Sequence, residues 1–142
     1  MRINPGRTEL MTTAEIVNEL LQRLDSRNAE AVGQLFADKI DWYVPGNSDL
    51  PWVGQRTSRG QVPEYFRTMW PHFVDGKSSA TVEKVVIDGA DAVIFAVFQH
   101  TAASTGRTFR TPTAMHVKVV DDKIVKLHLY EDTAKVSDAF FD

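Results

Sequence analysis

The spacing of apolar residues differs between the two halves of this 142-residue chain, with a mainly helical period in the first and the period of β-strands in the second. Before residue 74, apolar residues recur every three or four positions, as Ile16, Leu20 and Leu24 do. After residue 81, β-branched and aromatic runs are separated by turn signals. Helices followed by strands predict an α+β fold, in which three N-terminal helices pack against one face of an antiparallel sheet.

Three helices are predicted in the first half of the chain. The first begins at a capping box, because Thr12 can cap it and Glu15 stands three residues later. Asn28 is a candidate cap for the second helix. The third covers residues 58–72. Between the second and third helices we expect a short strand at residues 40–44 and then a loop with an apolar tip at residues 50–53.

Four further strands are predicted, over residues 82–88, 92–102, 108–120 and 124–132. A short helix or tail should follow over residues 133–141, and we expect Asp132 to cap it. No repeat, linker or low-complexity segment interrupts the chain. We therefore expect one domain over residues 13–142, preceded by an N-terminal extension of residues 1–12.

The turn at residues 121–122 determines the predicted register of the last two strands. A two-residue hairpin there places Val120 opposite Lys123 and His116 opposite Leu127. With a second hairpin tip at residues 105–106, nine side chains share one sheet face. They are Val93, Phe95, Val97, Gln99, Ala114, His116, Leu127, Leu129 and Glu131. An apolar face with a few polar groups is typical of a ligand pocket.

The opposite face of the predicted sheet is also rich in apolar residues. It includes Phe98, Met115, Val117 and Tyr130. An apolar stripe of this breadth is unusual on an exposed monomer surface. We therefore predict a homodimer that forms through this face.

Composition excludes several classes of function. The net charge is −3 and basic residues are not clustered, so neither nucleic acid nor a membrane is expected as a partner. The chain has no cysteine, and its four histidines lack metal-ligand spacing, so no metal site is predicted. Without a glycine-rich phosphate loop, no cofactor is expected. Neither a membrane-spanning run nor a signal-peptide core is present, which favours a cytoplasmic protein.

Two segments carry a resemblance to a known family. They are AVGQLFADKIDWYVPGNSDLPWVGQRTSRG, residues 31–60, and MHVKVVDDKIVKLHLYEDTAKVSDAFF, residues 115–141. The chain resembles the SnoaL-like proteins, which are relatives of ketosteroid isomerase within the nuclear transport factor 2 superfamily. The resemblance implies a cone-shaped fold with one deep apolar pocket. Because this fold hosts isomerases, hydrolases, cyclases and binding modules, the resemblance does not fix the chemistry.

The resemblance also allows two known mechanisms to be tested by position. In ketosteroid isomerase, the base falls on Val44, the tyrosine of the first helix on Leu20 and the buried carboxyl on His116. The acidic position of limonene epoxide hydrolase falls on Leu129. Valine and leucine cannot transfer a proton, so neither of these mechanisms is expected here.

His116 and Glu131 are the predicted catalytic residues, with Gln99 as polar support. Seven further residues are predicted to bound the pocket, with Trp52 near its mouth: Trp42, Trp52, Phe66, Trp70, Phe95, Leu127 and Leu129. The first hypothesis is an acid/base enzyme of isomerase, cyclase or hydrolase type, acting on an apolar cyclic or polyketide-like compound. The alternative is a non-catalytic module that binds a hydrophobic ligand.

Overall fold

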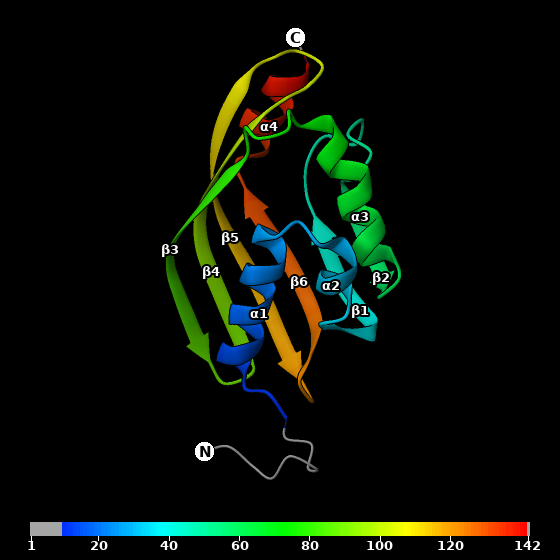
Figure 1. Ribbon diagram of the computed structural model, residues 1–142, viewed down its shortest axis with the longest axis vertical. Coiled ribbons are helices and arrows are strands. Elements are labelled where there is room, and N and C mark those ends of the chain that lie inside the picture. The colour runs from blue at the N-terminus through cyan, green and yellow to red at the C-terminus, as the bar shows by residue number, and fades with distance from the viewer. Residues whose placement is uncertain (1–9, 142) are drawn as a thin grey trace.

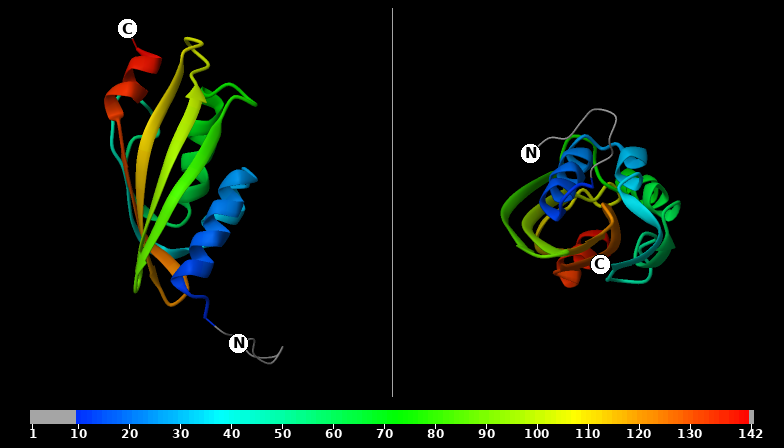
Figure 2. Two further views of the ribbon diagram at one scale, coloured as in Figure 1. Left: turned by 90° about the vertical axis from the view of Figure 1, so that its left-hand side faces the viewer. Right: turned by 90° about the horizontal axis from the view of Figure 1, so that it is seen from below.

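Helices cover one side of a curved six-stranded sheet. The computed structural model describes residues 10–141. Helices α1 (Thr13–Asp25), α2 (Ala29–Gly33) and α3 (Gln61–Met69) lie over the concave side of the sheet (Figure 1). Seen from below, the sheet is strongly curved and the helices lie across the open side of its arc (Figure 2). The predicted α+β class and cone are confirmed. Most of the predicted N-terminal extension, residues 1–9, lies outside the described residues.

The strands follow the spatial order β2-β1-β6-β5-β4-β3. Their bounds are β1 Phe36–Val44, β2 Gly54–Ser58, β3 Ser79–Asp88, β4 Asp91–Thr101, β5 Thr108–Val120 and β6 Lys123–Glu131. The 3-10 turn η1 (Trp70–His72) extends α3, and the helix α4 (Thr133–Phe140) follows β6. Strands β3 to β6 form the predicted antiparallel meander. The sheet is nevertheless mixed, because β1 pairs with β6 in parallel. Strand β2, in a segment predicted as loop and helix start, pairs with β1.

Local signals fix the helix ends. Thr12 accepts a hydrogen bond from the Glu15 amide at 3.1 Å, and the Glu15 carboxylate accepts one from the Thr12 amide at 2.9 Å, so the predicted capping box is confirmed. Asn28 caps α2. Gly33 lets α2 approach α3 closely, because a Cβ there would lie 2.9 Å from the ring of Pro63. These contacts place the inner faces of the helices over the sheet.

A β-bulge at Val125 sets the faces of the last strand. Asp121 and Asp122 both have positive φ, 50° and 54°, and Val120 pairs with Lys123, so the predicted two-residue turn is confirmed. Val119 then pairs with Ile124, but Lys118 pairs with Lys126. The extra residue places every later β6 side chain on the opposite face from its predicted β5 partner, so Leu127, Leu129 and Glu131 face inward as predicted but His116 does not. The predicted register of β5 and β6 is therefore wrong beyond the first two pairs.

The register change separates residues that were predicted to lie together. His116 pairs with His128, and both point away from the helices. Leu127 pairs with Val117 and Leu129 with Met115, and all four are buried inside. Between β4 and β5 the register is displaced by two residues, with Phe95 opposite Ala114. A shift of two residues keeps the predicted side chains of β4 and β5 together on one face, but that face points away from the helices and not toward them. The face of β4 and β5 predicted to form the pocket is thus the outer face.

The predicted dimer face is wrong for the same reason. Met115 and Val117 are buried in the core, and Phe98 packs against it. Tyr130 does lie outside, and it is 56% exposed. The outer sheet face presents Tyr43, Phe95 and Tyr130 instead.

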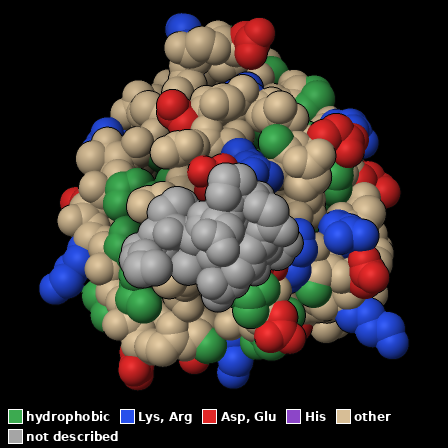
Figure 3. Space-filling view, turned by 60° about the horizontal axis from the view of Figure 1, so that its bottom comes forward, with side chains coloured by type: hydrophobic (Ala, Val, Ile, Leu, Met, Phe, Trp, Pro, Cys, Tyr) green, Lys and Arg blue, Asp and Glu red, His purple; other side chains and the backbone are tan. Residues whose placement is uncertain are grey.

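The surface is mixed in charge. On the face shown in Figure 3, acidic and basic side chains are interspersed among small hydrophobic areas. No helix among residues 10–141 is long and apolar enough to cross a membrane.

Candidate functional site

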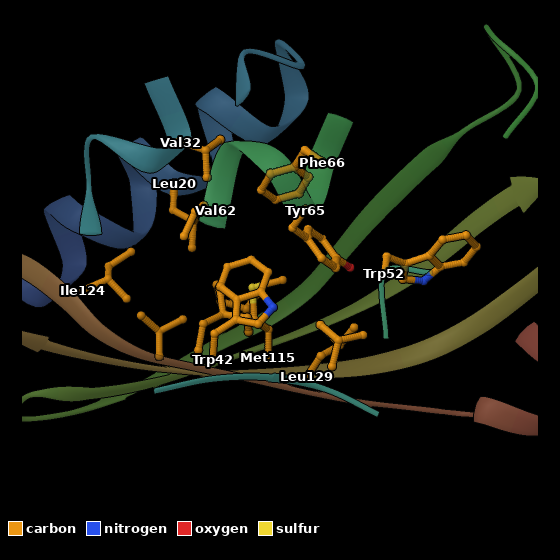
Figure 4. Packing of buried hydrophobic residues seen from close by; sticks show 14 of the residues in the cluster. Leu20, Val32, Trp42, Trp52, Val62, Tyr65, Phe66, Met115, Ile124 and Leu129 are labelled. Carbon is orange, nitrogen blue, oxygen red and sulfur yellow. The ribbon is translucent and has the colours of Figure 1, made fainter. Parts of the chain in front are cut away.

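A cavity of about 400 Å³ lies between the helices and the concave face of the sheet. Its walls are mainly aromatic and aliphatic, and they come from α1, α2, α3, η1, the sheet and α4. Figure 4 shows Tyr65 and Phe66 of α3 across the interior from Trp42 and Leu129 of the sheet. The volume is suited to a small organic molecule. The residues that line the cavity include Arg27, Trp42, Trp52, Tyr65, Phe66, Trp70, Ser78, His100, Leu127, Leu129 and Glu131.

The mouth of the cavity lies where its lining residues become exposed. Asp25 ends α1, Trp70 begins η1, and Ser79, Ala80 and Val82 lie at the start of β3. Asp25 and these three β3 residues are exposed, whereas the lining residues of β5 and β6 are buried or half-buried. The cavity therefore opens between the ends of α1 and α3 and the edge strand β3.

Seven of the predicted site residues line this cavity. They are Trp42, Trp52, Phe66, Trp70, Leu127, Leu129 and Glu131. His116, Phe95 and Gln99 do not line it, because they lie on the outer face. Phe95 is 40% exposed, and Gln99 accepts a hydrogen bond from Arg110 at 3.0 Å. The structure thus keeps Glu131 in the cavity and removes its predicted partners.

Trp52 closes the cavity instead of marking its mouth. Its side chain is only 3% exposed, although it lies in the loop between β1 and β2. The ring packs against Phe73 at 5.8 Å and against Phe140 of α4 at 5.4 Å, between ring centroids. The predicted position near the mouth is therefore wrong, because α4 and η1 cover this end of the cone.

Glu131 is the titratable group in the cavity that is best placed for acid/base chemistry. It is the last residue of β6, and the register set at Val125 turns it inward. Burial raises the pKa of its carboxyl to about 7, and the neighbouring charge of Asp132 acts in the same direction. A carboxyl with a pKa near 7 is available both as an acid and as a base at neutral pH.

Two hydrogen-bond donors share the cavity with Glu131. The indole of Trp42 is 1% exposed, and its Nε1–H has no hydrogen-bond partner among the described residues. The Tyr65 ring lies 4.9 Å from the Trp42 ring, and its hydroxyl points into the space between α3 and the sheet (Figure 4). Burial raises the pKa of Tyr65 far above its ordinary value, and the charge of Glu131 adds to the rise. The phenol is therefore a donor throughout the neutral range.

His100 is the histidine that lies inside. Its ring stacks on Phe73 at 4.2 Å, and its Nδ1 shares a 2.8 Å hydrogen bond with the hydroxyl of Ser78. Burial lowers its pKa to about 4, and the charge of Arg27 contributes. The ring is thus neutral at neutral pH and serves as part of the wall.

His116 and His128 instead form a row on the outer face. His116 Nε2 lies 2.8 Å from Asp91, and His128 Nε2 lies 2.8 Å from Asp41. Each ring is oriented by a carboxylate, but the row borders no part of the cavity. Within residues 10–141, no group of three histidine, aspartate or glutamate side chains could hold a metal ion.

A family model agrees with this architecture. The model of the SnoaL-like domain matches residues 17–127, which is more than half of the chain. The chain belongs to the SnoaL-like family. A search of curated proteins found no match.

Solved structures share the fold with this SnoaL-like protein at low identity. An NTF2-like protein from Burkholderia pseudomallei K96243 has a TM-score of 0.84 and 17% identity, covering 94% of this chain and 100% of that one. TerC, co-crystallised with polyporic acid, has a TM-score of 0.79 and 13% identity, covering 90% and 97%. A protein with a ketosteroid isomerase-like fold from Catenulispora acidiphila DSM 44928, in complex with trimethylamine, has a TM-score of 0.74 and 20% identity, covering 90% and 93%. These likenesses establish the NTF2-like fold.

Three positions that the sequence comparison aligned with catalytic residues of ketosteroid isomerase or limonene epoxide hydrolase lie on the cavity wall. Val44, Leu20 and Leu129 all line the cavity and are nearly fully buried. They supply shape but no proton. Tyr65 was missed by the sequence interpretation, although it stands three residues after Val62 and four before Met69 on the same helix face. That helical spacing is a signal that could have identified it.

Proposed function

We propose that this SnoaL-like protein binds a small apolar cyclic compound that has a carbonyl group. Glu131 removes a proton from the carbon next to that carbonyl and then returns it. The observation that carries the proposal is the Glu131 carboxyl, which lies in a mainly apolar cavity where burial raises its pKa to about 7. Such a perturbed, buried carboxyl is a common feature of acid/base sites. The ligands named for TerC and for the Catenulispora protein support a small-molecule role for this fold.

The proposed step is an enolisation. The Glu131 carboxylate takes a proton from the carbon next to the carbonyl, and the electron pair of the broken C–H bond moves toward the carbonyl oxygen. The Trp42 Nε1–H and the Tyr65 hydroxyl donate to the oxygen as its charge grows. The protonated Glu131 then returns the proton, to the same or another carbon, as an isomerase or cyclase reaction requires.

Deuterium exchange into a simple aromatic ketone tests this step. 2-Acetylnaphthalene has an apolar ring system and acidic methyl protons beside its carbonyl. In D₂O near neutral pH, the protein should accelerate loss of the methyl proton signal in NMR spectra, by at least about tenfold over buffer. Glu131→Gln should abolish the acceleration while leaving the ketone bound. Exchange that is equally fast in Glu131→Gln would exclude Glu131 as the base.

A binding module is the second candidate, and the position of His116 favours it. Because His116 lies on the outer face, the cavity holds one carboxyl poised near neutral pH instead of the predicted acid/base pair. Under this alternative, 2-acetylnaphthalene binds without exchange of its methyl protons. The deuterium-exchange experiment followed by NMR therefore separates the two candidates.

Dimerisation is a further part of the proposal. The outer sheet face presents Tyr43 at 43%, Phe95 at 40% and Tyr130 at 56% exposure. Aromatic rings gathered on an open sheet face support its burial against a second copy of the chain. We also infer that the protein works in the cytoplasm, with neither nucleic acid nor a membrane as a partner.

A further inference from the structure

A cation stands at the mouth of the cavity. Among the described residues that line the cavity, Arg27 is the only lysine or arginine. It occupies the turn between α1 and α2 with a left-handed backbone, φ 53°, and its amide donates to the carbonyl of Leu24. A positive φ is uncommon for a residue with a side chain, so this turn has a specific shape.

The Arg27 guanidinium is held in place by contacts that leave it able to bind a ligand. Its Cζ lies 5.4 Å from the centre of the Trp70 ring, which also lines the cavity. Its ion pair with Asp75 is long, at 3.7 Å, and the Asp75 side chain is fully exposed. Asp25 also lies at the mouth and is exposed to solvent. Ion pairs with exposed carboxylates contribute little, so an incoming anion can replace them.

The charge of Arg27 reaches the cavity wall. It is the second cause, after burial, of the lowered pKa of His100. His100 is therefore neutral at neutral pH, and it is fixed by the Ser78 hydroxyl at 2.8 Å. At this end of the cavity, the positive charge therefore comes from Arg27 alone among the described lining residues. The neighbouring polar groups are the serine hydroxyls of Ser78 and Ser79 and the neutral ring of His100.

We propose that Arg27 selects ligands with an anionic group, so that the substrate is an apolar carboxylate or a similar amphipathic anion. Its ring system fills the cavity and its anionic group stays at the mouth against the guanidinium. A guanidinium fork matches the two oxygens of a carboxylate in geometry. This inference rests on the proposed small-molecule pocket and adds the chemical class of its ligand.

Two fluorescent probes that differ by one anionic group test the inference. 8-Anilinonaphthalene-1-sulfonate and N-phenyl-1-naphthylamine share their ring systems, and only the first has a sulfonate. In titrations of the full chain, Arg27→Gln should weaken binding of the sulfonate by at least about fivefold and change binding of the neutral probe by less than about twofold. Added salt should weaken only the sulfonate, because screening acts on its charge.

Matched variants control for charge elsewhere and for binding outside the cavity. Arg59→Gln removes a cation that pairs with Asp38 at 2.6 Å and does not line the cavity, so both affinities should stay unchanged. Phe95→Ser removes an exposed ring from the outer face and should also change neither. Loss of sulfonate binding in Phe95→Ser would place that probe on the outer face and overturn the inference.

The outcomes separate this inference from the proposed function. If both probes bind and Arg27→Gln weakens them equally or not at all, the pocket stands and the selection of anions by Arg27 is wrong. If neither probe binds the wild-type chain, the small-molecule pocket itself is contradicted, and this inference with it. Circular dichroism and thermal unfolding of Arg27→Gln should match wild type, so that lost binding reflects the missing guanidinium.

Discussion

The carboxylate of Glu131 lies close enough to Tyr65 for its charge to raise the pKa of the phenol. The two residues come from opposite walls of the cavity, because Glu131 ends β6 and Tyr65 lies in α3. One can move a proton near neutral pH and the other remains a hydrogen-bond donor. Their pairing is the basis of the acid/base proposal.

Replacing Glu131 should change stability with a defined pH dependence. Between about pH 4.5 and pH 7 the folded protein keeps a proton that the unfolded chain has lost, since the pKa is raised from 4.5 to about 7. This contribution to stability is complete below pH 4.5 and is lost as the pH rises through 7. At about pH 8, Glu131→Gln should therefore be more stable than wild type by up to about 3 kcal/mol. Near pH 4.5 the two should unfold alike.

Denaturant unfolding at several pH values measures this difference directly. Glu64→Gln provides a matched control, because Glu64 is exposed on the outer side of α3. A difference between Glu131→Gln and wild type that does not grow with pH would contradict a raised pKa.

His100 should act in the opposite direction. Its pKa is lowered from 6.5 to about 4, so the unfolded chain binds a proton that the folded protein does not. Its stabilising effect is present above pH 6.5 and is lost as the pH falls through 4. His100→Phe keeps a ring to stack on Phe73 but cannot titrate. Relative to wild type, this variant should gain thermal stability as the pH is lowered from about 7 to about 4; a constant difference would show that His100 titrates normally.

Insertion of one alanine between Lys126 and Leu127 should prevent folding. With Lys126 still opposite Lys118, the added residue would turn Leu127, Leu129 and Glu131 outward and bring His128 and Tyr130 toward the core. We expect loss of a cooperative unfolding transition in calorimetry. Val125→Thr, which retains the bulge residue and its β-branch, should cost no more than about 1 kcal/mol. An insertion variant that unfolds at the wild-type temperature would show that the register beyond Val125 does not set the faces.

The proposed dimer should depend on the outer face. Phe95→Lys together with Tyr130→Lys should produce a monomer in sedimentation experiments at micromolar concentration, whereas wild type should sediment as a dimer. Ile87→Lys is the matched control, because Ile87 is 43% exposed but pairs with the inward-facing Ala92. A monomeric wild type at that concentration would contradict the proposed dimer.

Local features of the fold could be read from the sequence, and long-range ones could not. The capping box at Thr12 and the turn at Asp121 and Asp122 depend on neighbouring residues, and both were predicted. Asp132 also caps α4, as predicted, by accepting from the Lys135 amide at 3.2 Å. The Val125 bulge depends instead on how β6 fits between β1 and β5, and no single residue signals it.

The candidate site was predicted in part for the same reason. The aromatic walls contributed by Trp42, Phe66 and Trp70 follow from helical and strand patterns that do not depend on the bulge. The predicted register placed His116 in the pocket, but that register is correct only for the first two residue pairs after the hairpin turn. The family resemblance supplied the cone and its pocket, but by aligning the buried carboxyl of ketosteroid isomerase with His116 it pointed the wrong face of β5 inward.

The pKa of Glu131 tests the central claim most directly. In protein labelled with ¹³C at glutamate side-chain carboxyls, the Glu131 signal is identified by its absence from Glu131→Gln and followed as the pH is raised. We predict a pKa of about 7 and a further rise when N-phenyl-1-naphthylamine fills the cavity, because the probe displaces water from the carboxyl. An ordinary pKa near 4.5 that does not change with the probe would contradict the proposed acid/base site.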